Sequence, residues 1–185
     1  MNMREQIWRR HPRYANQLVT LVAVAIVIAS QHAFASDIDN QTLKGLPGFY
    51  VAVEEVNEIG RNAGIQAETL ARDVELRLES QGARVYRTGS VLARLAESSP
   101  TTGFVYLNVN IGAVGPVLCW ALQFQVLQAS RLVRDPSIMQ PTAATWGYAN
   151  ILHCGTKAEL RSKVLDITDE LVTAWRSVNE SKPKE

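Results

Sequence analysis

Residues 103–127, GFVYLNVNIGAVGPVLCWALQFQVL, decide the fold of this chain. Within residues 103–111 and again within residues 117–127, apolar side chains occupy every second position. That period places them on one face, because successive side chains of a strand point to opposite faces. The glycines and proline of residues 112–116 suit a turn between the two runs. The stretch therefore predicts an antiparallel hairpin.

The two faces of this predicted hairpin differ in chemistry. One face is apolar, and the other carries amides and a phenol: Tyr106, Asn108, Asn110, Gln123 and Gln125. Helices packed on the apolar side alone would leave the second face open. An open face with these groups suits a protein partner or a saccharide, and the alternative is an ordinary solvated sheet surface.

The segment before the hairpin supplies further elements. Residues 49–56 are β-branched and aromatic, as in a covered strand. Apolar residues at spacings of three and four within residues 66–81 predict a helix that ends at Gly82. Residues 83–87 predict a second strand, parallel to the first. Residues 90–97 predict a short helix.

The clearest helix lies near the C-terminus. Thr156 followed by Glu159 matches a capping box, in which each residue bonds to the backbone of the other. Apolar residues then recur every three or four positions from Leu160 to Val178. This single stripe predicts a long helix that crosses the sheet beside the first one.

A long connection is expected between the hairpin and this helix. Residues 131–144 contain two prolines and no period. Trp146 and Tyr148 follow on either side of Gly147, where aromatic side chains of a loop either anchor a partner or fill the edge of the core. We count both aromatics among the candidate binding residues, with both roles open.

Together these elements predict one α/β (α+β) domain. It is a two-layer sandwich, with two long helices on one face of a mixed sheet of about four strands. The domain is expected to span residues 45–180, after a flexible lead-in over residues 36–44. Residues 181–185 are polar and are expected to fray.

The first 35 residues predict a cleavable signal peptide. Arginines precede a twelve-residue apolar stretch at residues 18–29, and a signal peptidase site follows between Ala35 and Ser36. As a helix this stretch covers about 18 Å, short of the roughly 30 Å hydrocarbon core, so an uncleaved anchor is the weaker interpretation. Either the general or the twin-arginine route would deliver the domain to the periplasm or outside the cell.

Charge argues against several partner classes. The chain holds 19 basic and 18 acidic residues, and removal of the arginine-rich residues 1–35 would leave a slightly negative domain. Its basic residues are scattered along the chain. The sequence therefore predicts neither a nucleic-acid-binding groove nor a basic membrane-binding patch, and no stable membrane span after cleavage.

Cys119 and Cys154 are a candidate disulfide. Two cysteines in an exported domain commonly pair, and two separate thiols are the alternative. His153 is the only histidine beyond residue 35, which excludes a two-histidine zinc site. Thiol catalysis with His153 as the base is disfavoured, because His153 and Cys154 are adjacent and their side chains point apart.

Glu54, Glu55 and Glu58 cluster at the carboxyl end of the first predicted strand, where open α/β sheets tend to bind ligands. Paired carboxylates could perform acid–base chemistry there, but a solvated strand end with a following loop is the favoured interpretation. The glycines of residues 112–115 lack the Gly-Lys-Ser/Thr ending of a phosphate loop. The sequence indicates no metal site, no cofactor and no catalytic set.

Four segments resemble a family of small exported bacterial proteins without an assigned function. They are LKGL at residues 43–46, DVELRL at 73–78, YLNVN at 106–110 and WRSVN at 175–179. The order of the elements is also similar in topology to the amino-terminal α/β domain of the Tol translocation protein and related envelope-assembly domains. The resemblance implies export and an α/β fold, and it transfers no catalytic residue.

These observations favour a non-catalytic binding or assembly module in the bacterial periplasm, with an envelope protein or a cell-wall saccharide as its partner. Two alternatives stay open. A small hydrolase-like enzyme would need the carboxylate cluster or His153 in a pocket. A small-ligand carrier would need an enclosed apolar cavity between sheet and helices.

Overall fold

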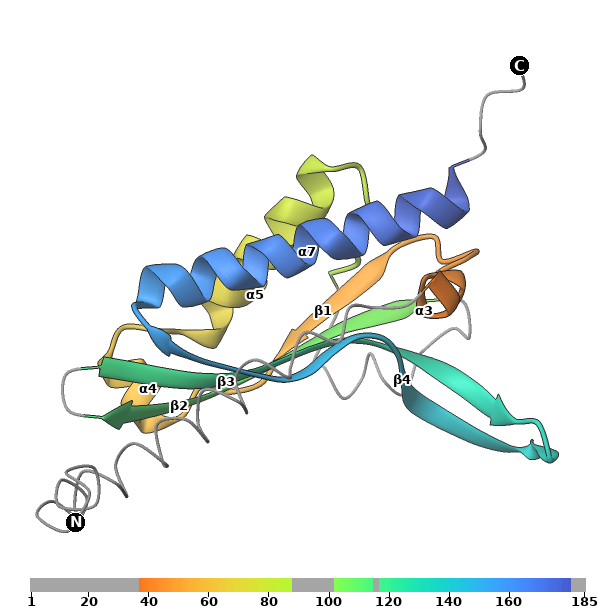
Figure 1. Ribbon diagram of the computed structural model, residues 1–185. Coiled ribbons are helices and arrows are strands. Elements are labelled where there is room, and N and C mark those ends of the chain that lie inside the picture. The colour runs from red at the N-terminus through yellow and green to blue at the C-terminus, as the bar shows by residue number, and fades with distance from the viewer. Residues whose placement is uncertain (1–36, 88–101, 115–116, 181–185) are drawn as a thin grey trace, which may run out of the picture. The chain divides into compact units, whose positions relative to one another are not determined.

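The computed structural model describes residues 37–87, 102–114 and 117–180 (Figure 1). The expected signal peptide, the expected short helix over residues 90–97 and the expected frayed tail over residues 181–185 all lie outside these described residues. Part of the expected turn over residues 112–116 lies outside them as well.

The described part of the chain contains one four-stranded mixed sheet with the strand order β1-β2-β3-β4. Its strands are β1 (Phe49–Val53), β2 (Gly103–Val114), β3 (Val117–Leu132) and β4 (Asp135–Gly155). β1 and β2 are parallel, whereas β2, β3 and β4 are successively antiparallel. The predicted hairpin is confirmed, with Asn108 opposite Gln123 and Ile111 opposite Trp120.

Two long helices, α5 (Ala67–Ser80) and α7 (Lys157–Asn179), pack against each other over one face of the sheet (Figure 1). The described residues also form two short helices, α3 (Asp37–Gln41) and α4 (Glu58–Asn62). This arrangement confirms the predicted two-layer α/β sandwich. The predicted capping box is also present, with Thr156 as the N-cap of α7.

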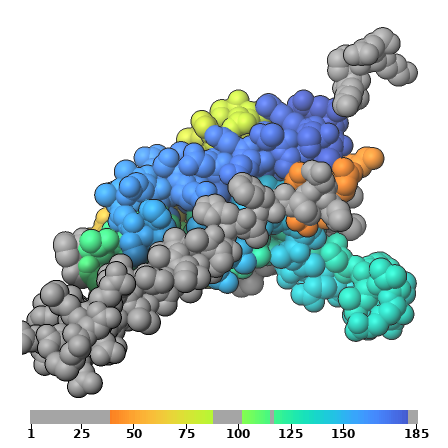
Figure 2. Space-filling model, viewed as in Figure 1, coloured from red at the N-terminus to blue at the C-terminus, as the bar shows by residue number. Residues whose placement is uncertain are grey.

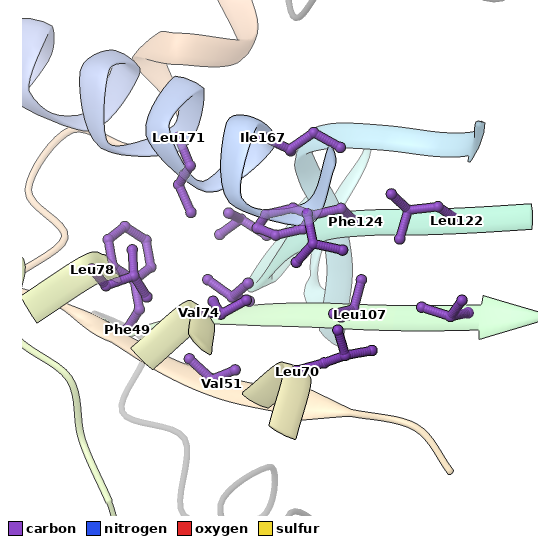
Figure 3. Close-up of a cluster of buried hydrophobic side chains, with 14 of the residues drawn as sticks. Phe49, Val51, Leu70, Val74, Leu78, Leu107, Leu122, Phe124, Ile167 and Leu171 are labelled. Atoms are coloured by element: carbon purple, nitrogen blue, oxygen red, sulfur yellow. The ribbon is translucent and has the colours of Figure 1, made fainter. Parts of the chain in front are cut away.

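The core lies between the helices and the sheet, as Figure 3 shows. Alternate residues of β2 and β3, among them Leu107, Leu122 and Phe124, point into it and are fully buried. Val74 of α5 and Leu171 of α7 meet them from the other layer. Apolar burial of this extent is the main favourable contribution to folding.

The prediction of an irregular connection over residues 131–144 is wrong. β3 continues to Leu132 and β4 begins at Asp135, so these residues form the end of a long hairpin. The pairing of β3 with β4 contains four register shifts. Such bulges interrupt the alternation by which a strand is recognised in a sequence, and an edge strand tolerates the prolines that seemed to exclude one.

The segments around β1 also differ from expectation. Residues 83–87 form no full strand, and only Val85 makes an isolated parallel bridge to Phe49. β1 itself ends at Val53. The sheet therefore has the expected number of strands, but the fourth strand is β4 and not the strand expected over residues 83–87.

The prediction of a flexible lead-in over residues 36–44 is wrong. Part of this segment forms helix α3, and the side chain of Leu43 is fully buried. Asn179 at the end of α7 fastens this segment. Its side-chain amide donates to the Leu43 carbonyl over 2.9 Å and accepts from the Gly45 N–H over 2.7 Å. These contacts are between residues far apart in the sequence, which explains why local composition did not predict them.

The β3–β4 hairpin extends beyond the rest of the sheet. β2 pairs with β3 only from Phe104, opposite Leu127, onward. The remainder of the hairpin, residues 128–143, therefore forms a two-stranded projection, which we call the β-arm. Figures 1 and 2 show its end standing away from the other described residues, whereas at its base the Gln128 side chain donates to the Thr42 carbonyl over 3.1 Å.

Candidate functional site

The amides predicted to share a face do so. In the register of β2 and β3, Tyr106 lies opposite Gln125 and Asn108 lies opposite Gln123, while Asn110 follows on the same side of β2. Their apolar neighbours in sequence are buried under the helices, but these five side chains are half-buried or exposed. Within the described residues, α5 and α7 cover only the opposite side of the sheet.

Glu54 belongs to this same group. Its backbone N–H donates to the Leu107 carbonyl over 2.9 Å, which continues the β1–β2 pairing by one residue. Its carboxylate accepts a hydrogen bond of 2.5 Å from the Tyr106 hydroxyl and one of 2.6 Å from the Asn108 amide. We call the set Glu54, Tyr106, Asn108, Asn110, Gln123 and Gln125 the polar face.

Hydrogen bonds continue along both strands of the polar face. The Asn110 side-chain amide donates to the side-chain oxygen of Asn108 over 3.0 Å, and the Gln123 side-chain amide donates to the side-chain oxygen of Gln125 over 2.8 Å. Each bond fixes one end of a side-chain amide, and an amide has further donor and acceptor positions that such a bond does not use. The polar face is thus pre-ordered, with hydrogen-bonding capacity left for a partner.

Burial raises the pKa of Tyr106 above its ordinary value, and the hydrogen bond to Glu54 raises it further. The phenol therefore keeps its proton at neutral pH and remains the donor to the Glu54 carboxylate. This arrangement orients the carboxylate as a hydrogen-bond acceptor, which suits binding.

Sequence reasoning assigned Glu54 to a carboxylate cluster with Glu55 and Glu58, and the structure separates them. Glu55 lines a hollow of about 230 Å³ with Arg61 and Glu68. Glu58 is exposed in the first turn of α4. The missed signal was the alternation Tyr50, Ala52, Glu54, which places the carboxylate on the same face as Tyr106.

An aromatic row beside the polar face was also missed. The Tyr50 ring stacks on Phe104 with centroids 5.2 Å apart and contacts Tyr86 at 5.1 Å. The Arg84 guanidinium lies 4.8 Å from the Tyr86 ring centre. Because these residues come from three separate segments, only the folded chain brings them together.

Trp146 and Tyr148 do not lie on a loop, because both belong to β4. Trp146 is buried, and its indole N–H donates to the Asn40 side chain over 2.9 Å. The Tyr148 hydroxyl donates to Glu170 of α7 over 2.5 Å. Of the two roles left open, the structure places them at the edge of the core, on the helix-covered side.

Cys119 and Cys154 form a disulfide between β3 and β4, with Cα atoms 3.9 Å apart, and no free cysteine remains in the described residues. Neither cysteine is therefore a free thiol for which His153 could act as the base. His153 lies at the exposed edge and packs against the Trp120 ring, with centroids 4.6 Å apart. The described residues contain no group of three or more His, Cys, Asp or Glu side chains arranged to hold a metal ion.

A groove of about 480 Å³ lies between the N-terminal turns of α5 and α7. Ile65, Leu70 and Leu160 are the buried apolar residues that line it, and Lys157 and Arg161 are its cationic residues. The carrier alternative required a cavity enclosed between sheet and helices. This groove is formed by the two helices and their lead-in residues instead.

No family model and no curated protein matches the sequence. Two solved structures of PelC dodecamers from Paraburkholderia phytofirmans are weakly similar to this chain. One, a point variant, is 12% identical with a TM-score of 0.41, covering 71% of this chain and 90% of that chain. The other is 10% identical with a TM-score of 0.41, covering 77% and 93%. Within the described residues, no helix combines the length and apolar character that a membrane span requires.

Proposed function

We propose that this protein is a non-catalytic binding or assembly module of the bacterial periplasm, which recognises an envelope partner through the polar face. The observation that carries the proposal is the hydrogen-bonded set of Glu54, Tyr106 and Asn108 on the side of the sheet opposite the long helices. A pre-ordered polar surface lowers the entropic cost of binding, because its side chains are already held in place.

The expected compartment is supported by two independent features. The signal-like pattern in residues 1–35 predicts export. The disulfide between Cys119 and Cys154 is compatible with an oxidising compartment, where such bonds persist. The resemblance to small exported proteins agrees with both.

The test separates binding from stability by using the two faces of one strand pair. Asn108→Ala with Gln123→Ala should weaken capture of the partner from envelope extract while the melting temperature changes little, because both side chains are partly solvated. Leu122→Ala is the matched control on the buried face. It should cost about 2 to 5 kcal/mol of stability and affect capture only through unfolding.

Two versions of the capture assay distinguish the partner classes. A soluble envelope-protein extract tests a protein partner, and sedimentation with purified peptidoglycan tests a saccharide. A double variant that keeps both its stability and its capture in both assays would contradict the proposal. A large loss of stability would instead show that the polar face is covered in the folded protein.

A further inference from the structure

The end of the β-arm carries apolar side chains that the fold does not bury. Val133 is 99% exposed, Met139 is 55% exposed and Ile138 is 47% exposed. All three belong to a single hairpin end, in which Leu132 pairs with Asp135 around a two-residue turn. Large apolar side chains exposed together at the end of one hairpin make it a candidate interaction surface.

Two arginines accompany these apolar residues. Arg134 lies in the turn beside Val133, and Arg131 lies opposite Met139 in the β3–β4 register. The arm has one carboxylate, Asp135, which accepts hydrogen bonds from the hydroxyl and the N–H of Ser137 over 2.6 and 3.1 Å. The tip is thus apolar and cationic, although the charges of the whole chain nearly balance.

The backbone of the arm disfavours docking by strand addition. β3 and β4 pair with each other in the arm as far as Leu132 opposite Asp135, with two register shifts on the way. Pro136 and Pro141 remove two N–H donors from β4, and prolines in an edge strand oppose pairing with a further strand. The β4 edge of the arm is therefore poorly suited to strand addition, and the exposed side chains of the tip are its more distinctive feature.

We propose that the tip of the β-arm docks on a bilayer surface that contains anionic phospholipid. Val133, Ile138 and Met139 would enter the boundary between headgroups and acyl chains, and Arg131 and Arg134 would pair with lipid phosphates. The charge of the tip favours an anionic surface, since each arginine near such a surface contributes about 1 kcal/mol. The backbone that the ladder leaves unpaired at the tip would stay at the level of the headgroups, where water and polar groups can bond to it.

This proposal concerns a different surface from the polar face. The polar face lies where β2 and β3 pair, and the arm is the part of the β3–β4 hairpin beyond that pairing. A protein anchored by the arm could still present the polar face to its partner. The two proposals can fail separately, because the variants that test them do not overlap.

The test is co-sedimentation with vesicles made of equal parts phosphatidylcholine and phosphatidylglycerol, compared with vesicles of phosphatidylcholine alone. The whole chain as exported is used, so any contribution from residues before the domain is common to every variant. Arg131→Gln with Arg134→Gln should weaken binding to the anionic vesicles by roughly thirtyfold at low salt. Val133→Ser with Met139→Ser should weaken it by on the order of tenfold.

The matched control is Val114→Ser with Val117→Ser. These valines are 71% and 44% exposed at the end of the β2–β3 hairpin, and their substitution should leave vesicle binding unchanged. Binding that is equal on the two vesicle types, or unaffected by both tip variants, would overturn the proposal. So would a change of oligomeric state in the tip variants without a change in vesicle binding, because the arm would then contact a second copy.

Discussion

At the scale of single residues, the start of α7 is held by two reciprocal hydrogen bonds. The Thr156 hydroxyl accepts from the Glu159 N–H over 3.2 Å, and the Glu159 carboxylate accepts from the Thr156 N–H over 2.6 Å. The bonds from Thr156 lower the pKa of Glu159 below its ordinary value. A carboxyl whose pKa is lowered in the folded state stabilises the fold at every pH above its ordinary pKa. This stabilisation is lost as the pH falls through the lowered pKa.

Glu159→Gln should therefore destabilise the protein at neutral pH and should make less difference as the pH falls below the ordinary carboxyl range. Urea unfolding of both proteins over a series of pH values measures this gap. Thr156→Ala removes the other half of the box and should cost about 1 kcal/mol. A gap between the Glu159 variant and the parent that is the same at every pH would contradict the assignment.

The disulfide is a second residue-scale feature with a measurable effect. The bridge closes a loop with a sequence separation of 35, for which chain-entropy reasoning gives about 3 to 4 kcal/mol. Exported protein should show no thiol that alkylates after denaturation without reductant. Cys119→Ser with Cys154→Ser should lower the free energy of unfolding by up to that amount. Two alkylated cysteines in the exported protein would refute the pairing.

At the scale of elements, α5 and α7 are joined by paired side chains as well as by the core. Arg77 reaches Asp169 through two hydrogen bonds of 2.6 and 2.5 Å, and Arg161 binds both oxygens of Asp73. The hydrogen bond from Arg77 lowers the pKa of Asp169. The arginines are substantially exposed, and exposed ion pairs contribute little to stability. The apolar stripes therefore hold the two helices on the sheet, and the ion pairs bridge the exposed sides of the two helices.

The close approach of the β4 backbone to the β3 backbone depends on Gly147. Its φ is +115°, a conformation that other residues rarely adopt, and an added Cβ would overlap the Phe124 carbonyl oxygen. Gly147→Ala should destabilise the protein by more than about 1 kcal/mol in chemical denaturation. Gly112→Ala is the control, because a Cβ there would meet only the Cys119 oxygen at 4.0 Å. Equal effects of the two substitutions would show that the backbone at Gly147 is not constrained.

At the scale of the whole molecule, three surfaces have separate chemistry. The long helices cover one side of the sheet, the polar face lies on the other, and the β-arm extends beyond both. Long-range contacts close the domain, since Asn179 near its C-terminal end binds the backbone at Leu43 and Gly45 near its start. The domain therefore includes residues before position 45, and a truncation at that point should remove part of the fold.

Export predicts a defined amino terminus for the mature protein. If residues 1–35 are a cleaved signal, terminal sequencing should find Ser36 as the first residue, and the protein should fractionate with periplasmic contents. Membrane association through the β-arm should then depend on lipid charge and salt, unlike that of an uncleaved anchor. Protein that begins at Met1 and stays with the membrane fraction after a high-salt wash would contradict cleavage.

The sequence by itself determined the features that depend on local periodicity. The hairpin of β2 and β3, the stripes of α5 and α7 and the capping box at Thr156 were all predictable, because alternation and helical spacing are properties of neighbouring residues. The shared face of Tyr106, Asn108 and Gln123 followed from the same alternation. Only tertiary structure decided the rest. Bulges concealed β4, Glu54 joined the polar face through pairing with β2, and Val133 and Arg134 gathered at an exposed tip because β3 outreaches β2. The alternation through Tyr50 and Glu54 is a local signal for the face of the carboxylate, but the strand beside it is decided by pairing between distant segments, and the exposed tip by where β2 stops pairing with β3.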